Sequence, residues 1–208
     1  MRAPALIVLA DALFKESYPG PLHVLTGEIA RRHRAIWVEA PVWECLKAPG
    51  LGFRLRRACR LDLPLERYMD DQRELDVLTP PILPPGNAVG DALLAQTVRW
   101  ILKGRKLEPR VLWLARRGPA ATALADRLKA DMIVDDHPDP APGDTWHPKA
   151  DLIIWPAEAP LPEGEHEGDP RLLRLSETGV RGALKLAPIV LDWLDGPTIV
   201  KTETRTRA

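Results

Sequence analysis

Short apolar runs alternate with longer amphipathic stretches along most of this chain. The runs predict buried strands at residues 5–9, 35–38, 75–78, 111–114, 132–134, 152–155 and 172–175. Between them, apolar residues three or four positions apart predict helices over 21–34 and 88–103, and from 119 through Leu124 and Leu128. This alternation is typical of βαβ units, whose parallel strands are covered by helices on both faces. We therefore expect an α/β fold over residues 1–180: a single Rossmann-like three-layer αβα domain with a mostly parallel sheet of about six or seven strands.

Two stretches depart from the alternation. Residues 41–72 are irregular and could hold one basic helix. The segment 181–208 is expected to be a C-terminal helical segment followed by a polar tail, although Pro188 would interrupt a helix over residues 183–194.

The charge balance changes this picture only locally. The 208 residues carry no net charge, so nothing global indicates nucleic-acid binding. Four arginines lie between residues 54 and 60, and such a cluster can bind phosphates or contact a lipid surface, although it is more often a solvated helix face. No apolar run is long enough for a transmembrane segment, no signal peptide is recognisable, and two cysteines make no disulfide framework. A cytoplasmic location is the expectation that follows.

The sequence Asp135-Asp136-His137, directly after a predicted strand, is the leading candidate for chemistry. Ligands of open parallel sheets bind beyond the carboxyl ends of the strands. A carboxylate beside an imidazole can orient it as a general base, so Asp136 and His137 are the candidate catalytic residues. With Asp144 and His147 the segment could also bind a divalent metal, but the spacing matches no defined motif and no metal is assigned. The alternative is a turn-capping Asp beside a solvent-exposed His.

Other candidates for substrate binding follow other strands. They are Lys15, Glu16 and Tyr18 after the first strand, Glu39 after the second, and Arg116 and Arg117 after the fourth. The first three suit a sugar or polyol, Glu39 could accept hydrogen bonds from hydroxyls, and the arginines precede a helix N-terminus that would favour an anion. Lys15, Glu16 and Tyr18 are equally compatible with an ordinary loop, and for Arg116 and Arg117 the favoured alternative is ordinary surface arginines in a turn.

Two kinds of aromatic side chain remain ambiguous. His23, in the first turn of a helix, could face the same crevice, although an exposed helical His fits the pattern better. Trp37, Trp113 and Trp155 lie in strands and are expected in the core, whereas Trp43 and Trp146 lie in loops and could stack on a ring.

Several motifs are absent. The segment after the first strand has no G-x-G-x-x-G, and the chain has neither a P-loop nor a G-x-S-x-G elbow. The standard dehydrogenase, NTPase and esterase classes are therefore excluded, and no cofactor is expected.

The order of several segments resembles the N-terminal, acceptor-side domain of a GT-B-fold glycosyltransferase. The segments that carry the resemblance are 22–41, 75–85, 111–128, 133–137 and 151–155. In that family a second Rossmann-like domain follows and holds the nucleotide sugar, and the chain has no stretch similar to it. The family's Gly-rich turn after the first strand and the Pro-Asn of its interdomain link are also absent.

The resemblance implies sugar transfer together with a separate donor-binding subunit, with a sugar acceptor bound by this chain. An exposed, partly apolar interdomain face would also suit a homodimer. The alternatives are a non-catalytic binding or scaffold protein derived from such an enzyme, and a small hydrolase or metal-dependent enzyme built on the acidic stretch 131–147.

Overall fold

The computed structural model describes residues 2–10, 14, 20–39, 65–70, 73–79, 88–116, 118–177 and 179–196. Its strands are β1 (Ala3–Leu9), β2 (Arg34–Val38), β3 (Leu65–Asp70), β4 (Arg73–Leu78), β5 (Leu107–Leu114), β6 (Met132–Asp136), β7 (Leu152–Pro156) and β8 (Leu172–Leu175). Its helices are α1 (Pro21–Ala30), α3 (Ala88–Gly104), α4 (Pro119–Leu128) and α5 (Gly179–Asp195).

All eight strands form one sheet in the order β3-β4-β2-β1-β5-β6-β7-β8. Seven of them run parallel, and β3 joins the edge antiparallel to β4. The α/β fold with a mostly parallel sheet is confirmed. The prediction did not include β3, because its sequence, LERYMD, has no continuous apolar run.

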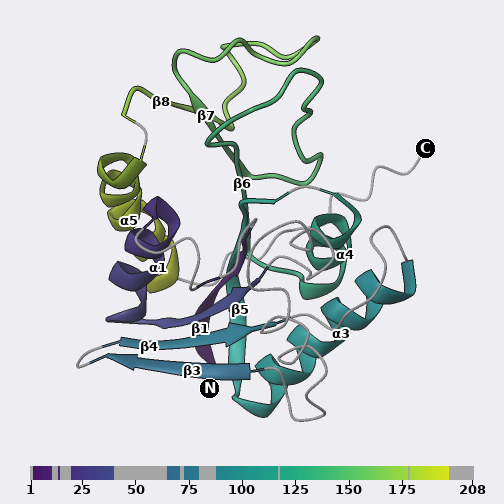
Figure 1. The fold of residues 1–208 in the computed structure, drawn as a ribbon, viewed down its shortest axis with the longest axis vertical. Coiled ribbons are helices and arrows are strands. Elements are labelled where there is room, and N and C mark those ends of the chain that lie inside the picture. Colours follow the sequence, from purple (N-terminus) through teal and green to yellow (C-terminus); the bar gives the residue numbers. More distant parts are fainter. Residues whose placement is uncertain are drawn as a thin grey trace, which may run out of the picture.

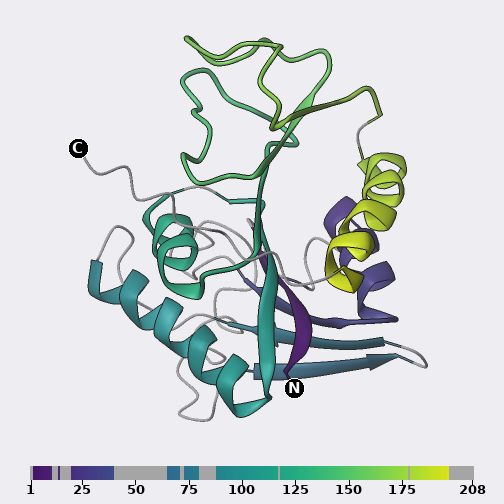
Figure 2. The ribbon, with the colours of Figure 1, turned by 180° about the vertical axis from the view of Figure 1, so that it is seen from behind.

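The helices cover the two faces in pairs, and both ribbon views show α1 beside α5 on one face and α3 and α4 on the other (Figures 1 and 2). Because side chains alternate along a strand, β1 supplies both cores. Ala5, Ile7 and Leu9 pack under α3 and α4, while Leu6 and Val8 pack under α1 and α5. This explains why β1 is apolar at every position from 5 to 9.

The connections after β6 and β7 contain no helix. They lie together at one end of the molecule (Figure 1) and enclose a third, small cluster of buried residues: Trp146, Ala150, Ile153 and Trp155. Trp146 is therefore a core residue, and the prediction that its ring could stack on a ligand is wrong. Trp37, Trp113 and Trp155 are buried as predicted, and Trp43 lies outside the described residues.

Helix α5 continues through Pro188, although this proline was expected to interrupt the helix. Pro188 lies on the solvent-facing side of α5, where water can bind the carbonyl that loses its helical partner. The opposite side of α5, including Ala183, Leu186 and Val190, packs in the α1 core. The expected helical segment after residue 181 is thus present, and the tail 197–208 lies outside the described residues. No helix in the described part of the chain is long and apolar enough to cross a membrane.

Candidate functional site

The strand order defines where a ligand would bind. The chain moves from β1 to β2 on one side and returns from β4 past β1 to β5 on the other, so the order reverses between β1 and β5. Ligands of open α/β sheets bind at such a reversal, beyond the carboxyl ends of the strands. Of the candidates there, Lys15, Glu16, Tyr18 and Arg117 lie outside the described residues. Arg116 is half-buried two residues after the end of β5.

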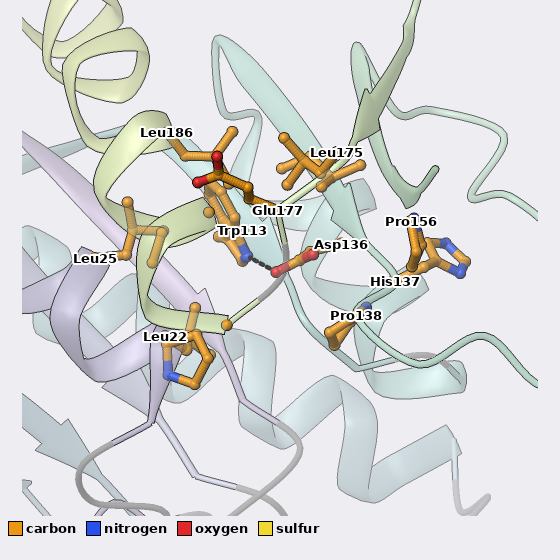
Figure 3. Close-up of a pocket in the computed structure, with 15 residues that line it drawn as sticks. Leu22, Leu25, Trp113, Asp136, His137, Pro138, Pro156, Leu175, Glu177 and Leu186 are labelled. Carbon is orange, nitrogen blue, oxygen red and sulfur yellow. Dashed lines mark hydrogen bonds between the residues drawn. The ribbon is translucent and has the colours of Figure 1, made fainter. Parts of the chain in front are cut away.

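A cavity of about 70 Å³ lies beside this point, between the first turns of α1 and α5 and the carboxyl ends of β5 to β8. Its wall is mainly apolar, with Leu22 and Leu25 from α1, Leu186 from α5, and Leu175 from β8 (Figure 3). Two carboxylate side chains, Asp136 and Glu177, are also in the wall. The volume is well below the about 300–1,000 Å³ of typical ligand pockets, so the cavity would admit one group of a larger ligand.

Asp136 is held in this wall by Trp113. The indole Nε1 of Trp113 donates a hydrogen bond of 2.9 Å to Oδ2 of Asp136 (Figure 3). Trp113 pairs in register with Val134, and Asp136 is two residues further along β6, hence on the same face. The indole of Trp113 reaches along the sheet from the position of Val134 to the carboxylate of Asp136. A half-buried carboxylate with a fixed orientation and apolar neighbours is suited to accept a proton from a bound hydroxyl.

Glu177 lies at the entrance to α5 and was not singled out from the sequence. Its carboxylate forms an ion pair of 2.9 Å with Lys185, and both side chains of the pair are exposed to solvent. Its backbone carbonyl is in close contact with Gly182, where an added Cβ would lie only 2.3 Å from the oxygen. A glycine is therefore required at 182 for α5 to begin this close to β8.

His137 does not share the face of Asp136. Its ring packs on Trp155 with centroids 4.6 Å apart, and its Nε2 donates a 2.8 Å hydrogen bond to Oδ2 of Asp135. Figure 3 shows the ring directed away from Asp136. His137 is 0% exposed and Asp135 2%, so the expected alternative of a solvent-exposed His is wrong. The carboxylate that orients the imidazole is therefore that of Asp135 and not, as expected, that of the adjacent Asp136, because residues i and i+2 share a face of a strand.

Asp135 also fixes the connection after β6. The same oxygen, Oδ2, accepts a 2.7 Å hydrogen bond from the backbone N–H of His147. Burial lowers the pKa of His147, although the negative charges of Asp135 and Asp126 oppose that effect. Within the described residues, no group of three or more His, Cys, Asp or Glu side chains is placed to hold a metal ion.

Glu39 lies at the carboxyl end of β2 and is fully buried. Its two carboxylate oxygens accept hydrogen bonds from the backbone N–H of Phe14, at 3.0 Å, and from the hydroxyl of Thr79, at 2.8 Å. It joins the segments that follow β1, β2 and β4, and it is not among the residues around the cavity.

His23 is buried, so its expected exposure on the helix is wrong. Its Nε2 donates a 2.7 Å hydrogen bond to the carbonyl of Phe14, and its ring packs against Phe14 and Trp37, each with centroids 4.6 Å apart. Burial lowers the pKa of His23, and the bond to Phe14 only partly offsets this. The side chain therefore helps to hold Phe14 against the end of the sheet.

Comparison of the chain with protein-family models, with curated proteins and with solved structures gives no match in any of the three.

Proposed function

We propose that this domain is the acceptor side of a sugar-transfer reaction, with Asp136 as general base and a separate subunit supplying the nucleotide-sugar donor. The observation that carries the proposal is the position of Asp136. It is a strand-end carboxylate, fixed by Trp113 at 2.9 Å, in the wall of an apolar cavity at the carboxyl edge of a parallel sheet.

In this reaction an acceptor hydroxyl enters the cavity and Asp136 takes up its proton. The hydroxyl oxygen forms a bond to the anomeric carbon of the donor sugar, and the bond from that carbon to the nucleotide breaks, with the electron pair leaving on the phosphate. Arg116, two residues after the end of β5, is the guanidinium proposed to contact the leaving phosphate. His137 acts as a positioning residue, because its buried ring and Asp135 fix the backbone at the end of β6.

The donor subunit is assigned to the outer side of α5. Val180, Leu184 and Ile189 of this helix are exposed, and α5 begins at the cavity. No G-x-G-x-x-G follows β1, so this chain does not offer the usual glycine-rich cradle for a nucleotide diphosphate.

The test is calorimetric binding of two panels, simple glycosides and nucleotide sugars, to the purified chain. We expect a glycoside to bind and nucleotide sugars not to bind. Asp136→Asn should weaken glycoside binding about tenfold or more, since a bond to a charged group is worth about 1.5–3 kcal/mol. Glu163→Gln, at an exposed loop position, is the matched control and should leave binding unchanged. Tight binding of a nucleotide sugar by the chain alone, or no glycoside binding at all, would contradict the proposal.

The second candidate is a non-catalytic binding or scaffold protein derived from a glycosyltransferase. The cavity volume of about 70 Å³ favours it, because that space is too small for a whole sugar ring with its neighbours. In that case Asp136→Asn would leave partner binding intact, and no turnover would be found with any donor subunit.

A further inference from the structure

Helix α3 has an unusual outer face. Its inner side, including Leu94, Val98 and Ile101, packs in the core. Its outer side also has large apolar groups: Trp100 is 55% exposed and Leu93 is 47% exposed. These two residues are seven positions apart, which is two helical turns, so they lie on the same side of the helix.

The apolar groups on α3 lie among positive charges. A groove of about 650 Å³ runs between the second half of α3, the end of α4 and the start of β5. Trp100 is in its wall together with five basic side chains: Arg2, Arg99, Lys103, Arg127 and Lys129. All five are exposed, and none has an ion-pair partner within the described residues.

Negative charge is nearly absent from this surface. The exposed positions of α3 include no Asp or Glu. The one carboxylate in the wall of the groove, Asp126, is paired with Lys149. The helix dipoles stabilise cations at the C-terminal ends of α3 and α4, but this effect is confined to the last turn. It does not account for Arg2, Arg99 or an exposed Trp.

We infer that this surface, formed by the outer side of α3 and the basic groove beside it, binds an anionic lipid bilayer. Exposed Trp and Leu beside Arg and Lys are the combination that an interfacial helix presents to a membrane, with the apolar groups at the headgroup–acyl boundary and the cations on lipid phosphates. A soluble phosphate or a nucleic acid would use the charges but would leave Leu93 without a role. The surface lies on the face of the sheet opposite the cavity, so the inference is independent of the proposed function.

The test is co-flotation of the full chain with vesicles of phosphatidylcholine alone and of phosphatidylcholine mixed with phosphatidylglycerol. We expect binding to the mixed vesicles only, weakening at high salt. The double variant Arg99→Gln/Lys103→Gln should bind about 25-fold more weakly, at about fivefold for each charge near such a surface. Trp100→Ser should also weaken binding several-fold, whereas excess glycerol phosphate should not release the protein.

The matched control is Arg181→Gln/Lys185→Gln, which removes two exposed charges from α5 on the opposite face. It should bind the mixed vesicles as the unmodified chain does. Equal weakening by both double variants would overturn the inference, as would a lack of flotation with mixed vesicles. Tighter binding to a single-stranded oligonucleotide, or release by glycerol phosphate, would also overturn it and reassign the surface to those ligands.

Discussion

Asp135 and Asp136 are adjacent in β6, but their carboxylates lie on opposite faces of the sheet. Asp135 bonds His137 at 2.8 Å and is buried with it, whereas Asp136 bonds Trp113 at 2.9 Å in the wall of the cavity. One carboxylate therefore stabilises the fold and the other is available to the candidate site.

Replacing Asp135 with Ala should lower the free energy of unfolding by about 3 kcal/mol, because it leaves buried polar groups of His137 and His147 without their shared acceptor. Urea denaturation checks this value. The control Asp139→Ala changes an exposed carboxylate three residues beyond Asp136 and should stay within about 0.5 kcal/mol of the original. Equal effects of the two variants would show that the buried pair is not structural.

Replacing Trp113 with Phe should cost more than the same change at Trp37. Both indoles are buried in the α1–α5 core, but Nε1 of Trp37 has no hydrogen-bond partner among the described residues, whereas Nε1 of Trp113 donates to Asp136. The two variants lose similar volume, so the difference in unfolding free energy reports the bond. We expect about 1.5–3 kcal/mol, measured by urea denaturation of both variants. A difference near zero would indicate that Trp113 does not fix Asp136.

Replacing Gly182 with Ala should lower the melting temperature by several degrees. The new Cβ would lie 2.3 Å from the backbone oxygen of Glu177, which cannot move away as a flexible side chain could. Gly104→Ala, at the end of α3 with nothing within 4 Å, is the control and should leave the melting temperature nearly unchanged. An unchanged melting temperature of the Gly182→Ala variant would contradict the close contact of α5 with residue 177.

The stability should fall as the pH falls below about 6.5, in part through His23. Burial lowers the pKa of His23 in the folded chain, so the unfolded chain binds the proton first. The contribution is complete above the unfolded pKa and is lost progressively as the pH decreases from the unfolded pKa to the lower folded pKa. Between about pH 7 and about pH 5, the His23→Gln variant should therefore show a smaller decrease in the free energy of unfolding than the unmodified chain. Identical pH profiles for the two proteins would contradict this assignment.

The sequence predicted the seven parallel strands because each contains a short, mainly apolar run, and recognising such a run needs no tertiary information. The strand β3 could not be predicted in this way, since LERYMD is polar and gains its place at the sheet edge from pairing with β4. The pairing of Asp135 with His137 follows from the two-residue period of a strand and was available from the sequence. The bond between Trp113 and Asp136 was not, because it depends on the register of β5 against β6.

The helix-free connections after β6 and β7 have a consequence for how the molecule opens. Their small cluster of Trp146, Ala150, Ile153 and Trp155 shares no residue with the two larger cores. Loss of this cluster would expose little of the remaining interior, so this end of the sheet should open at lower free energy than the β1 centre. Amide hydrogens of the connections 137–151 and 157–171 would then exchange with solvent before those of β1 and β5. The two connections would behave as a separate cooperative unit, held to the rest of the sheet by the hydrogen bonds of Asp135.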